Sequence, residues 1–439
     1  MNKSFKQRLH DVIPGGAHTY SRGDDQFPAN APSILTRGKG CRVWDVDNRE
    51  FIDYGMGLRS VNIGYGHEEI AQAAYQEILN GNNLTRASVT ELLAAELLRD
   101  MIPSAEMVKF AKHGSTVTTA AVKLARAYTG RKYIAIPQEH PFFSFDDWFI
   151  GATIMKRGVP HEFSDLTLRF VYNDADSLQK LFDQYPNQIA GVMLEAATTV
   201  GPAALNGDPK KNFLHAVKGI CKKNGAVFIL DEMITGFRWH LQGAQAYFNI
   251  EPDLSTFGKA MANGFAVAAL TGKKEIMGIG GILEEGAERV FLTSTTHGAE
   301  MSALGAFIKT MEILRRDKVV EHFWKFGASL MKQMNDLATE LGIGKYFSCE
   351  GYPCSPNYIT KGPDGKPSLA FRTLFSQEMV SQGILMPYVA LSFAHKEADL
   401  ERTIDACKSA FRIYGRALEE GIEKYLKSPV IKPVFRQYN

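Results

Sequence analysis

The segment Ile229-Leu230-Asp231-Glu232-Met233-Ile234-Thr235-Gly236 decides how the rest of this chain is interpreted. It overlaps a continuously apolar run, Ala226-Val227-Phe228-Ile229-Leu230, which predicts a strand buried on both faces. Asp231 follows directly where this strand should end, and open α/β folds bind ligands at the carboxyl edge of their sheet. Asp231 is therefore a candidate site residue, although an acid at this place can also cap the next helix.

A lysine follows this acid 28 residues later, in Gly258-Lys259, after the short apolar run Leu254-Ser255-Thr256-Phe257. Lys259 is therefore a candidate for the same sheet edge as Asp231. A converging amine and carboxylate suit pyridoxal phosphate, which needs an amine for its aldehyde and a carboxylate for its ring nitrogen. The alternative is a solvated lysine without a chemical role.

Composition places the chain among soluble globular enzymes. Its 439 residues are too many for one simple core, so two or three structural units are expected. Apolar residues make up 45% and charged residues 22% of the chain, and both values are ordinary. A formal net charge of +2, with acids and bases interspersed, argues against a nucleic-acid partner.

The cysteines and the amino terminus point to a cytoplasmic protein. Five cysteines without metal-ligand spacing favour reduced thiols and argue against a metal site. The start, Met-Asn-Lys-Ser-Phe-Lys-Gln-Arg, lacks the apolar stretch of a signal peptide, and no apolar run reaches membrane-spanning length. We expect a soluble cytoplasmic protein with no membrane partner.

Strand-like and helix-like segments alternate through the middle of the chain, which predicts a mostly parallel sheet covered by helices on both faces. An amphipathic pattern predicts helices over 68–102, split near 81–83, and another helix is expected over 299–314. A β-hairpin is expected over 42–54, turning at Asp47-Asn48. The expected strands of the sheet are 108–110, 133–136, 168–171, 189–194, 226–230 and 266–270.

Two hydroxyl-rich segments precede expected helices. Gly114-Ser115-Thr116 directly precedes a helical pattern over 117–128, and Thr293-Ser294-Thr295-Thr296 lies before the later helix. Free N–H groups and the helix dipole at such a place can bind a phosphate. Ser and Thr are also the commonest residues that cap a helix, so the structural role is the alternative for both segments.

Several motifs together resemble the class-III aminotransferases of fold type I, and within them most closely the glutamate-1-semialdehyde aminomutases. The resemblance rests on the segments 109–131, 231–236, 257–259 and 295–306. It also includes Ile13-Pro14-Gly15-Gly16, Trp44-Asp45-Val46-Asp47 and Ala244-Gln245-Ala246-Tyr247-Phe248, so that it covers nearly the whole chain in order.

This resemblance implies an α/β fold with a large domain that binds pyridoxal phosphate. Its mostly parallel seven-stranded sheet would lie between layers of helices, and a small α+β domain would be drawn from both chain ends. The boundaries expected here are 1–65 for the amino-terminal part of the small domain, 66–320 for the large domain and 321–439 for the rest of the small domain.

The resemblance also implies roles for individual residues. Lys259 would be the catalytic Schiff-base lysine, and Asp231 would pair with the pyridine nitrogen. Thr295 would bind the phosphate of the neighbouring subunit's cofactor, which implies a homodimer with shared sites. The full set of implied cofactor-binding residues is Gly114, Ser115, Phe142, Glu195, Asp231, Met233, Lys259 and Thr295.

The chain departs from the aminomutase pattern around the expected substrate site. The family's Tyr-His-Gly is replaced within 140–148, where Phe142 is the candidate for covering the cofactor ring and ordinary core packing is the alternative. His297-Gly298-Ala299-Glu300 and Met56-Gly57-Leu58-Arg59-Ser60 also differ from that pattern. Arg22 aligns with the family's carboxylate-binding arginine, and Arg59 is an added candidate, since arginine suits bidentate recognition of carboxylates.

These departures favour an aminotransferase that moves an amino group from an amino-acid donor, expected to be L-glutamate, to an aldehyde or ketone such as a sugar. The aminomutase reaction is the first alternative, and a racemase or decarboxylase on the same scaffold is the second. A cofactor-free relative that serves as a binding dimer is the third, but such a protein would not need Lys259.

Overall fold

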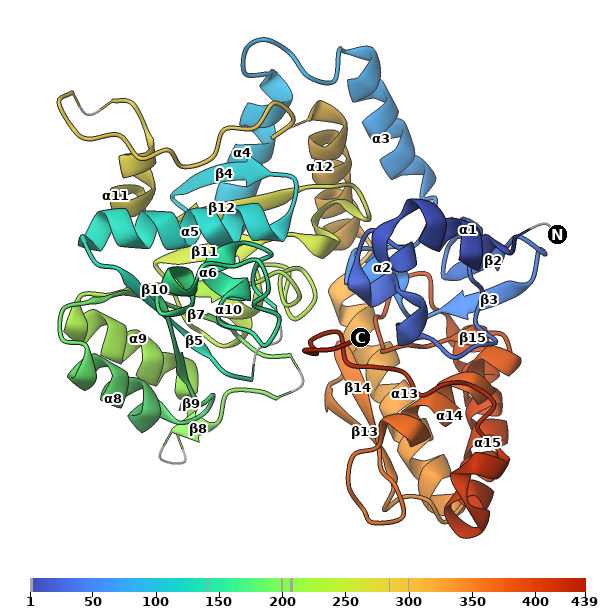
Figure 1. The fold of residues 1–439 in the computed structure, drawn as a ribbon. Coiled ribbons are helices and arrows are strands. Elements are labelled where there is room, and N and C mark those ends of the chain that lie inside the picture. Colours follow the sequence, from blue (N-terminus) through green and yellow to red (C-terminus); the bar gives the residue numbers. More distant parts are fainter. Residues whose placement is uncertain (1–2, 140–141, 199, 206–207, 284, 299) are drawn as a thin grey trace. The chain divides into compact units, whose positions relative to one another are not determined.

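The computed structural model describes residues 3–139, 142–198, 200–205, 208–283, 285–298 and 300–439. The chain forms two compact units (Figure 1). The smaller unit combines Met1–His67 with Glu321–Val434, and the larger unit combines Glu68–Val320 with Phe435–Asn439. Both ends of the chain therefore contribute to the smaller unit, while the last five residues belong to the larger one.

The larger unit is built on a seven-stranded sheet with the order β4-β12-β11-β10-β7-β5-β6. β12 pairs antiparallel with both β11 and β4, and the other pairings are parallel. The expected mostly parallel sheet is thus confirmed, with one reversed strand. The strands are β4 (Met107–Ala111), β5 (Tyr133–Pro137), β6 (Thr167–Phe170), β7 (Ile189–Glu195), β10 (Val227–Asp231), β11 (Leu254–Phe257) and β12 (Ala268–Gly272).

The centre of this sheet is apolar because its strands are covered on both faces. Every residue of β7 and of β10 is buried, as expected for near-continuous apolar runs in a parallel sheet. Figure 1 shows α5 (Gly114–Thr129) on one side of the sheet and α8 (Ala175–Gln184) and α9 (Phe213–Asn224) on the other. The carboxyl ends of the parallel strands are therefore left as the open edge.

Further helices complete the larger unit. The expected split helix is present as α3 (Glu68–Leu79) and α4 (Val89–Met101), and α12 (Met301–Arg316) packs against both. Residue 299, where this last helix was expected to begin, lies outside the described residues. The shorter elements are α6 (Asp147–Ile150), α7 (His161–Ser164), β8 (Ala204–Leu205), β9 (Asp208–Asn212), α10 (Ala244–Tyr247), η4 (Lys259–Ala262), α11 (Lys274–Met277) and η5 (Gly278–Gly280).

The smaller unit joins the two chain ends in one four-stranded sheet, β1-β2-β3-β15. The expected hairpin is confirmed as β2 and β3, and Asn48 in its turn adopts a positive φ of 59°. Strand β15 pairs in parallel with β3. The strands are β1 (Leu35–Lys39), β2 (Arg42–Asp45), β3 (Glu50–Asp53), β13 (Phe347–Tyr352), β14 (Ser355–Thr360) and β15 (Ile384–Leu385).

Three long helices, α13, α14 and α15, supply most of the helical part of the smaller unit, and short turns occupy its amino-terminal segment. The helices are α1 (Phe5–Val12), α2 (Met56–Arg59), α13 (Val319–Glu340), α14 (Leu369–Ser381) and α15 (Glu397–Glu420). The 3₁₀ turns are η1 (Pro14–Gly16), η2 (Tyr20–Arg22), η3 (Asp24–Gln26) and η6 (Ile422–Lys424).

The short helix α2 is a left-handed turn. Its residues Met56, Gly57, Leu58 and Arg59 have φ values of 40°, 58°, 62° and 68°. Only glycine adopts this region without steric cost, so three of the four residues are strained. This turn occupies one of the segments in which the sequence departs from the aminomutase pattern.

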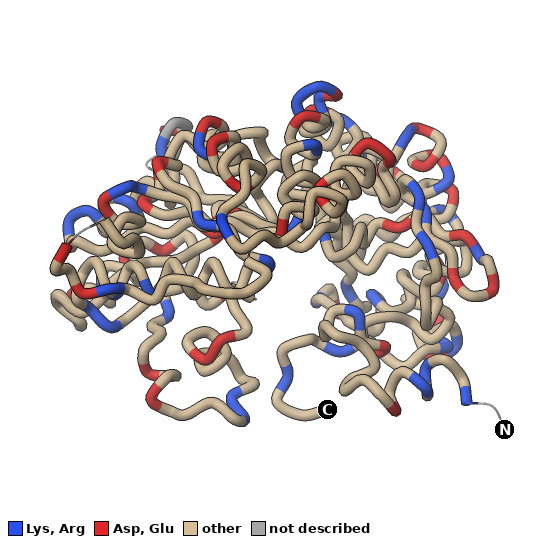
Figure 2. Tube along the Cα trace, turned by 90° about the horizontal axis from the view of Figure 1, so that it is seen from above, with Lys and Arg blue, Asp and Glu red and all other residues tan. Residues whose placement is uncertain are grey.

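The distribution of charged residues, cysteines and apolar helices bears on the partners expected from the sequence. Basic and acidic residues are interspersed along the trace in Figure 2. Over the described ranges, no group of three or more His, Cys, Asp or Glu is arranged to hold a metal ion. The five cysteines are buried and free. Among the helices that the structure describes, none has the length and apolar composition needed to cross a membrane.

Candidate active site

Three polar side chains form a row across the carboxyl edge of the central strands. Asp231 at the end of β10 is in register with Glu195 on β7 and with Thr256 on β11. All three residues are buried, with exposed fractions of 2%, 4% and 0%. The sequence predicted Glu195 and Asp231 as site residues, and the sheet register brings them together.

The Asp231 carboxyl is held by its neighbours in one orientation. Its Oδ1 accepts hydrogen bonds from the Met233 backbone N–H at 3.0 Å and from the Thr256 hydroxyl at 2.9 Å. Burial raises the pKa of Asp231, and the nearby Glu195 carboxyl raises it further, while the Lys259 charge lowers it. This carboxyl therefore lacks enough positive charge around it to be a stable anion by itself.

Lys259 begins the turn η4, two residues after β11 ends. Its φ of 40° lies in the left-handed region, which is strained for a lysine. Strained backbone persists only where the surrounding structure holds it, and it is concentrated at functional sites. The lysine is half-buried, and its charge acts on the Asp231 carboxyl. The two residues that decided the sequence interpretation thus meet at one sheet edge.

Met233 fills the space between two glycines of this edge. A Cβ on Gly258 would lie 2.5 Å from the Met233 sulfur, and a Cβ on Gly114 would lie 2.8 Å from it. Neither position can carry a larger side chain unless Met233 moves. Met233 therefore links the lysine turn to the start of α5. Glycine at positions 114 and 258 leaves the space that the Met233 sulfur occupies.

Glu232 fixes the backbone behind the site, and the sequence analysis did not identify it. Its buried carboxylate accepts hydrogen bonds from the backbone N–H groups of Ala244 and Gln245 and from the Thr235 hydroxyl, at 2.7 to 2.9 Å. The one sequence feature that could have drawn attention to Glu232 was its position directly after Asp231. Because its partners lie up to 13 residues away, the pattern alone could not show this role.

The amino terminus of α5 provides the candidate phosphate site. The helix begins at Gly114, three residues earlier than the pattern predicted. The side chain of its capping residue His113 accepts no hydrogen bond from a backbone N–H of the first turn and lies instead 2.8 Å, through Nδ1, from the Thr116 hydroxyl, so Gly114 and Ser115 carry first-turn N–H groups. The Ser115 hydroxyl accepts a hydrogen bond from the Phe145 backbone N–H at 3.1 Å. The segment after β5 is thereby held against the start of α5.

Phe142 lies on that segment and is 46% exposed. Its ring contacts Phe149 and Phe435, with centroids 5.8 Å and 6.5 Å away. Phe145, also exposed, packs edge-on against the His113 ring at 5.7 Å. Residues 140 and 141, which begin the segment that replaces the family's Tyr-His-Gly, lie outside the described residues. Phe145 therefore borders the start of α5, while the Phe142 ring packs against Phe149 and Phe435.

Thr295 is exposed, in the loop before α12. Its backbone oxygen accepts a hydrogen bond from the Gly298 N–H at 3.2 Å. The end of this loop is held by an ion pair of 2.6 Å between Lys112 and Glu300. The ion pair thus holds Glu300, at the start of α12, against Lys112.

The two candidate substrate arginines belong to the smaller unit. Arg22 is exposed at the end of η2. Arg59 ends the left-handed turn, donates to the Ser355 hydroxyl at 2.8 Å and lies 4.9 Å from the centre of the Tyr388 ring. Arg59 is therefore held in a defined orientation within its unit.

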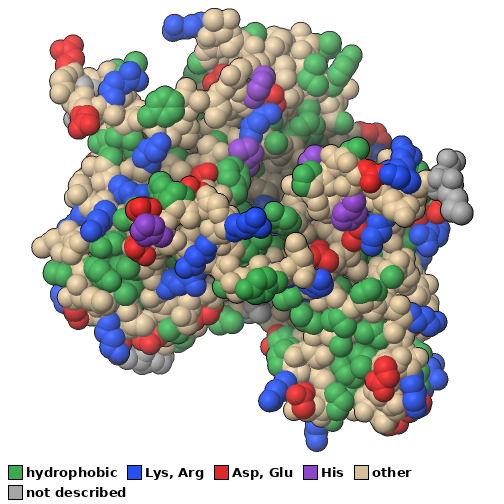
Figure 3. Space-filling view, viewed as in Figure 1, with side chains coloured by type: hydrophobic (Ala, Val, Ile, Leu, Met, Phe, Trp, Pro, Cys, Tyr) green, Lys and Arg blue, Asp and Glu red, His purple; other side chains and the backbone are tan. Residues whose placement is uncertain are grey.

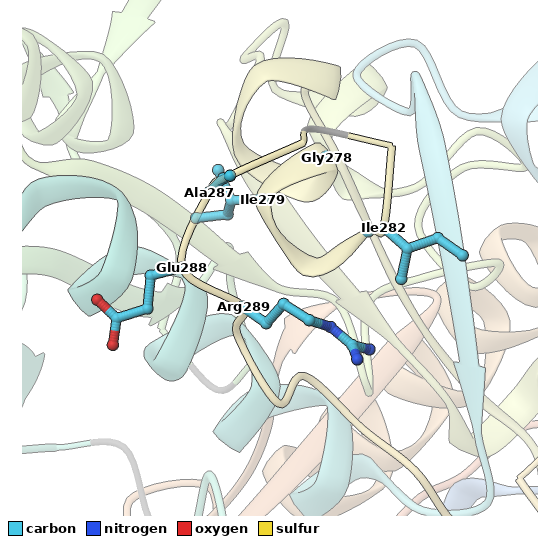
Figure 4. A pocket seen from close by; sticks show the side chains of 8 residues that line it. Gly278, Ile279, Ile282, Ala287, Glu288 and Arg289 are labelled. Carbon is cyan, nitrogen blue, oxygen red and sulfur yellow. The ribbon is translucent and has the colours of Figure 1, made fainter.

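A separate cavity of about 480 Å³ lies in the loop after α11. Figure 4 shows Ile282 and Arg289 on this loop, and the lining includes neither Asp231 nor Lys259. On the face drawn in Figure 3, hydrophobic side chains are scattered among charged ones. Because its lining includes neither Asp231 nor Lys259, the cavity after α11 is distinct from the row of polar residues at the sheet edge.

Comparison with known proteins agrees with this geometry. The aminotransferase class-III family model matches residues 25–345. The chain is 32% identical over 413 residues to a 3-aminobutyryl-CoA aminotransferase from Cloacimonas acidaminovorans, covering 93% of this chain and 95% of that protein. It is also 32% identical over 431 residues to a glutamate-1-semialdehyde 2,1-aminomutase from Syntrophomonas wolfei, covering 92% and 96%.

A solved structure shares the fold. The FumI protein of Sphingopyxis, solved in its PLP internal aldimine form, superimposes with a TM-score of 0.83 at 26% identity, covering 95% of this chain and 97% of that one. The family match spans well over half of the chain. The chain therefore belongs to the class-III aminotransferase family, as its motifs indicated.

Proposed function

We propose that this protein is a pyridoxal-phosphate aminotransferase that moves an amino group from L-glutamate to an aldehyde or ketone acceptor. The observation that carries the proposal is the meeting of Asp231 and Lys259 at the carboxyl edge of the sheet, beside the uncapped start of α5. The membership of the class-III family supports it.

The residues of this edge suit the cofactor. The Asp231 carboxyl has a raised pKa because it is buried beside Glu195, and a protonated pyridine nitrogen would supply the positive charge that stabilises its anion. The first-turn N–H groups of Gly114 and Ser115 suit a phosphate. We assign Met233 and Phe142 to the walls of the same site and Glu195 to the ring edge.

The chemistry divides between the cofactor and the protein. When bound, the cofactor accepts the electron pair left on the substrate α-carbon after a proton is removed. Lys259 carries that proton on its Nζ and returns it at the other end of the transfer. Asp231 keeps the ring nitrogen protonated, and Thr256 and the Met233 N–H hold Asp231 in orientation.

We assign substrate carboxylates to Arg22 and Arg59. Arg22 is exposed, and its guanidinium suits a carboxylate of the donor. Arg59 is oriented by Ser355, Tyr388 and a strained left-handed turn. A turn that costs folding free energy yet orients one arginine suits a recognition role.

We propose a homodimer in which Thr295 reaches the phosphate site of the neighbouring subunit. Thr295 is exposed within its own chain, as such a role requires. Exposed apolar side chains are also gathered on α3, on α4 and between them, where a second copy could bury them. They are Tyr75, Ile78, Leu79, Leu84, Val89, Leu92 and Leu93.

The aminomutase reaction is the second candidate, because one relative of equal identity has that name. An aminomutase must retain its reaction intermediate, and this chain departs from the aminomutase pattern at 56–60, 140–148 and 297–300. Transfer between two different molecules is therefore preferred. Racemisation and decarboxylation on the same scaffold remain distinguishable by their products.

Absorbance spectroscopy tests the proposal. Purified protein supplied with pyridoxal phosphate should develop a visible absorption band that L-glutamate removes, with release of 2-oxoglutarate. Lys259→Ala should lose both responses, and Lys274→Ala, at an exposed lysine, should keep them. Isomerisation of glutamate 1-semialdehyde without an added donor would favour the aminomutase. Failure of the wild type to bind the cofactor would refute the proposal.

A further inference from the structure

The last five residues, Phe435–Asn439, belong to the larger unit, although the preceding segment Glu321–Val434 belongs to the smaller one. Phe435 is half-buried and packs against the apolar core cluster of the larger unit. The reaction proposed above gives this tail no role. Its contact with Phe142, which the proposed function assigns to the cofactor site, indicates one.

The Phe435 ring completes a cluster of three rings. Its centroid lies 6.5 Å from the Phe142 ring and 6.5 Å from the Phe149 ring. Phe142 and Phe149 are 5.8 Å apart and nearly perpendicular, at 82°. These distances lie in the range of favourable aromatic pairs. Phe142 therefore contacts one ring from the sheet region and one from the end of the chain.

The two supporting rings differ in how firmly they are held. Phe149 is 2% exposed and also contacts Phe143 and Trp148, so it is part of the rigid core. Phe435 also lines a cavity of about 260 Å³ at the end of β5, together with Ile136, Phe149 and Ile154. Without the Phe435 ring, this cavity would be wider and the Phe142 ring would lose one of the two rings that it contacts.

The backbone beside Phe142 is held by polar contacts, but those contacts do not orient its ring. The Thr118 hydroxyl donates to the Phe143 carbonyl at 2.9 Å, and the Phe145 N–H donates to Ser115 Oγ at 3.1 Å. These bonds place the segment at the start of α5. The orientation of the half-exposed Phe142 ring then depends on its contacts with Phe149 and Phe435.

We infer that Phe435 is a positioning residue of the active site, which holds the Phe142 ring in the orientation that forms a wall of the cofactor site. This inference rests on the proposed function, which assigns Phe142 to that wall. It makes the carboxyl-terminal tail part of the site of its own chain. A ring that is misplaced by about 1 Å is enough to reduce catalysis strongly.

A double-mutant cycle tests the inference by measuring the dissociation constant of pyridoxal phosphate through absorbance titration of the apoprotein. The four proteins are the wild type, Phe142→Ala, Phe435→Ala and the double variant. We expect Phe435→Ala alone to raise the dissociation constant about tenfold, the size of one aromatic pair. The same change should have no further effect in the Phe142→Ala background, because Phe435 acts through that ring.

Two further variants serve as controls. Phe435→Tyr keeps the ring and should restore wild-type affinity. Tyr438→Ala removes a side chain of the same tail that is 78% exposed, and it should leave affinity unchanged. Melting temperatures of all variants separate a loss of affinity from a general loss of stability.

The outcomes separate the inference from the proposed function. Equal weakening by Phe435→Ala in both backgrounds, or no weakening in either, would overturn the inference. A lower melting temperature with unchanged affinity would show a structural role only, and would overturn it as well. If the wild type takes up no cofactor, the proposed function fails and the inference fails with it.

Discussion

Glu195 and Asp231 are paired in register on two adjacent parallel strands, and both carboxyls are almost completely buried. The Glu195 carboxyl disfavours ionisation of Asp231 and adds to the effect of burial, because two buried anions at such a place repel each other. The Lys259 charge offsets part of this repulsion. The pair therefore creates a site that favours a cationic ligand group, and a pyridinium ring is such a group.

The first prediction concerns Asp231 and pH. Because burial and Glu195 raise the pKa of Asp231 to about 7, the carboxyl of the apoprotein is neutral below that pH. Pyridoxal-phosphate affinity should therefore rise as the pH increases through this range, since the anion forms. Absorbance titration of the apoprotein with pyridoxal phosphate, at pH values from about 5.5 to 8.5, measures this change in affinity on both sides of the pKa.

Asp231→Asn is the matched variant for that experiment. The pyridoxal-phosphate affinity of this variant should lack the pH dependence that Asp231 contributes. Its kcat should be lower by roughly 100-fold or more, as is typical when a preorganised electrostatic partner is removed. A wild type whose affinity changes with pH in the same way as that of the variant would contradict the assignment of Asp231.

The second prediction concerns the contact between Met233 and Gly258. The Cβ of a Gly258→Ala variant would lie 2.5 Å from the Met233 sulfur, so the methionine must move. We expect weaker cofactor binding in Gly258→Ala, and partial restoration when Met233→Ala is added, since the smaller side chain removes the clash. Dissociation constants from absorbance titration measure both effects. Gly219→Ala is the control, because its added Cβ would meet no atom within 4 Å.

The third prediction concerns the left-handed turn. Leu58 has a φ of 62°, and glycine adopts this conformation without strain. Leu58→Gly should raise the free energy of unfolding by up to about 1 kcal/mol. It should also raise KM for the amino donor, because the turn that orients Arg59 becomes flexible. Denaturant unfolding and steady-state kinetics measure the two effects, and a variant with unchanged KM would remove the support for Arg59.

The fourth prediction concerns the buried His395 in the smaller unit. Burial lowers the pKa of His395 to about 4, despite the opposing charge of Asp399, and its Nδ1 accepts from the Ser392 N–H at 3.1 Å. The unfolded pKa is about 6.5, so the neutral ring favours folding fully above that value. This stabilisation is lost as the pH falls from about 6.5 towards 4.

Urea unfolding at several pH values measures this effect. In His395→Gln, the free energy of unfolding should depend less on pH between about pH 6.5 and 4, because the titrating group has been removed. His240→Gln, at a half-buried histidine of the larger unit, is the control and should retain the wild-type slope. The same slope in all three proteins would show that His395 does not govern acid stability.

Local patterns predicted the elements of the fold well. The apolar run that ends at Asp231 formed β10, the Asp47-Asn48 turn formed the hairpin, and the split amphipathic pattern formed α3 and α4. The start of α5 was predicted three residues too late. A Gly-Ser-Thr segment is equally compatible with a cap and with a first turn, and only the neighbouring residues decide between them.

The sequence by itself indicated the fold-type-I architecture and the family, because the motifs that resemble this family are continuous in the chain, and it singled out Asp231 and Lys259, because each follows a short apolar run. Only the tertiary structure decided the direction of β12, the anchoring role of Glu232, the left-handed turn at Arg59 and the packing of Phe435 on Phe142. The physical reason is that these features depend on contacts between residues far apart in the chain, or on backbone strain held by such contacts. Neither leaves a local pattern.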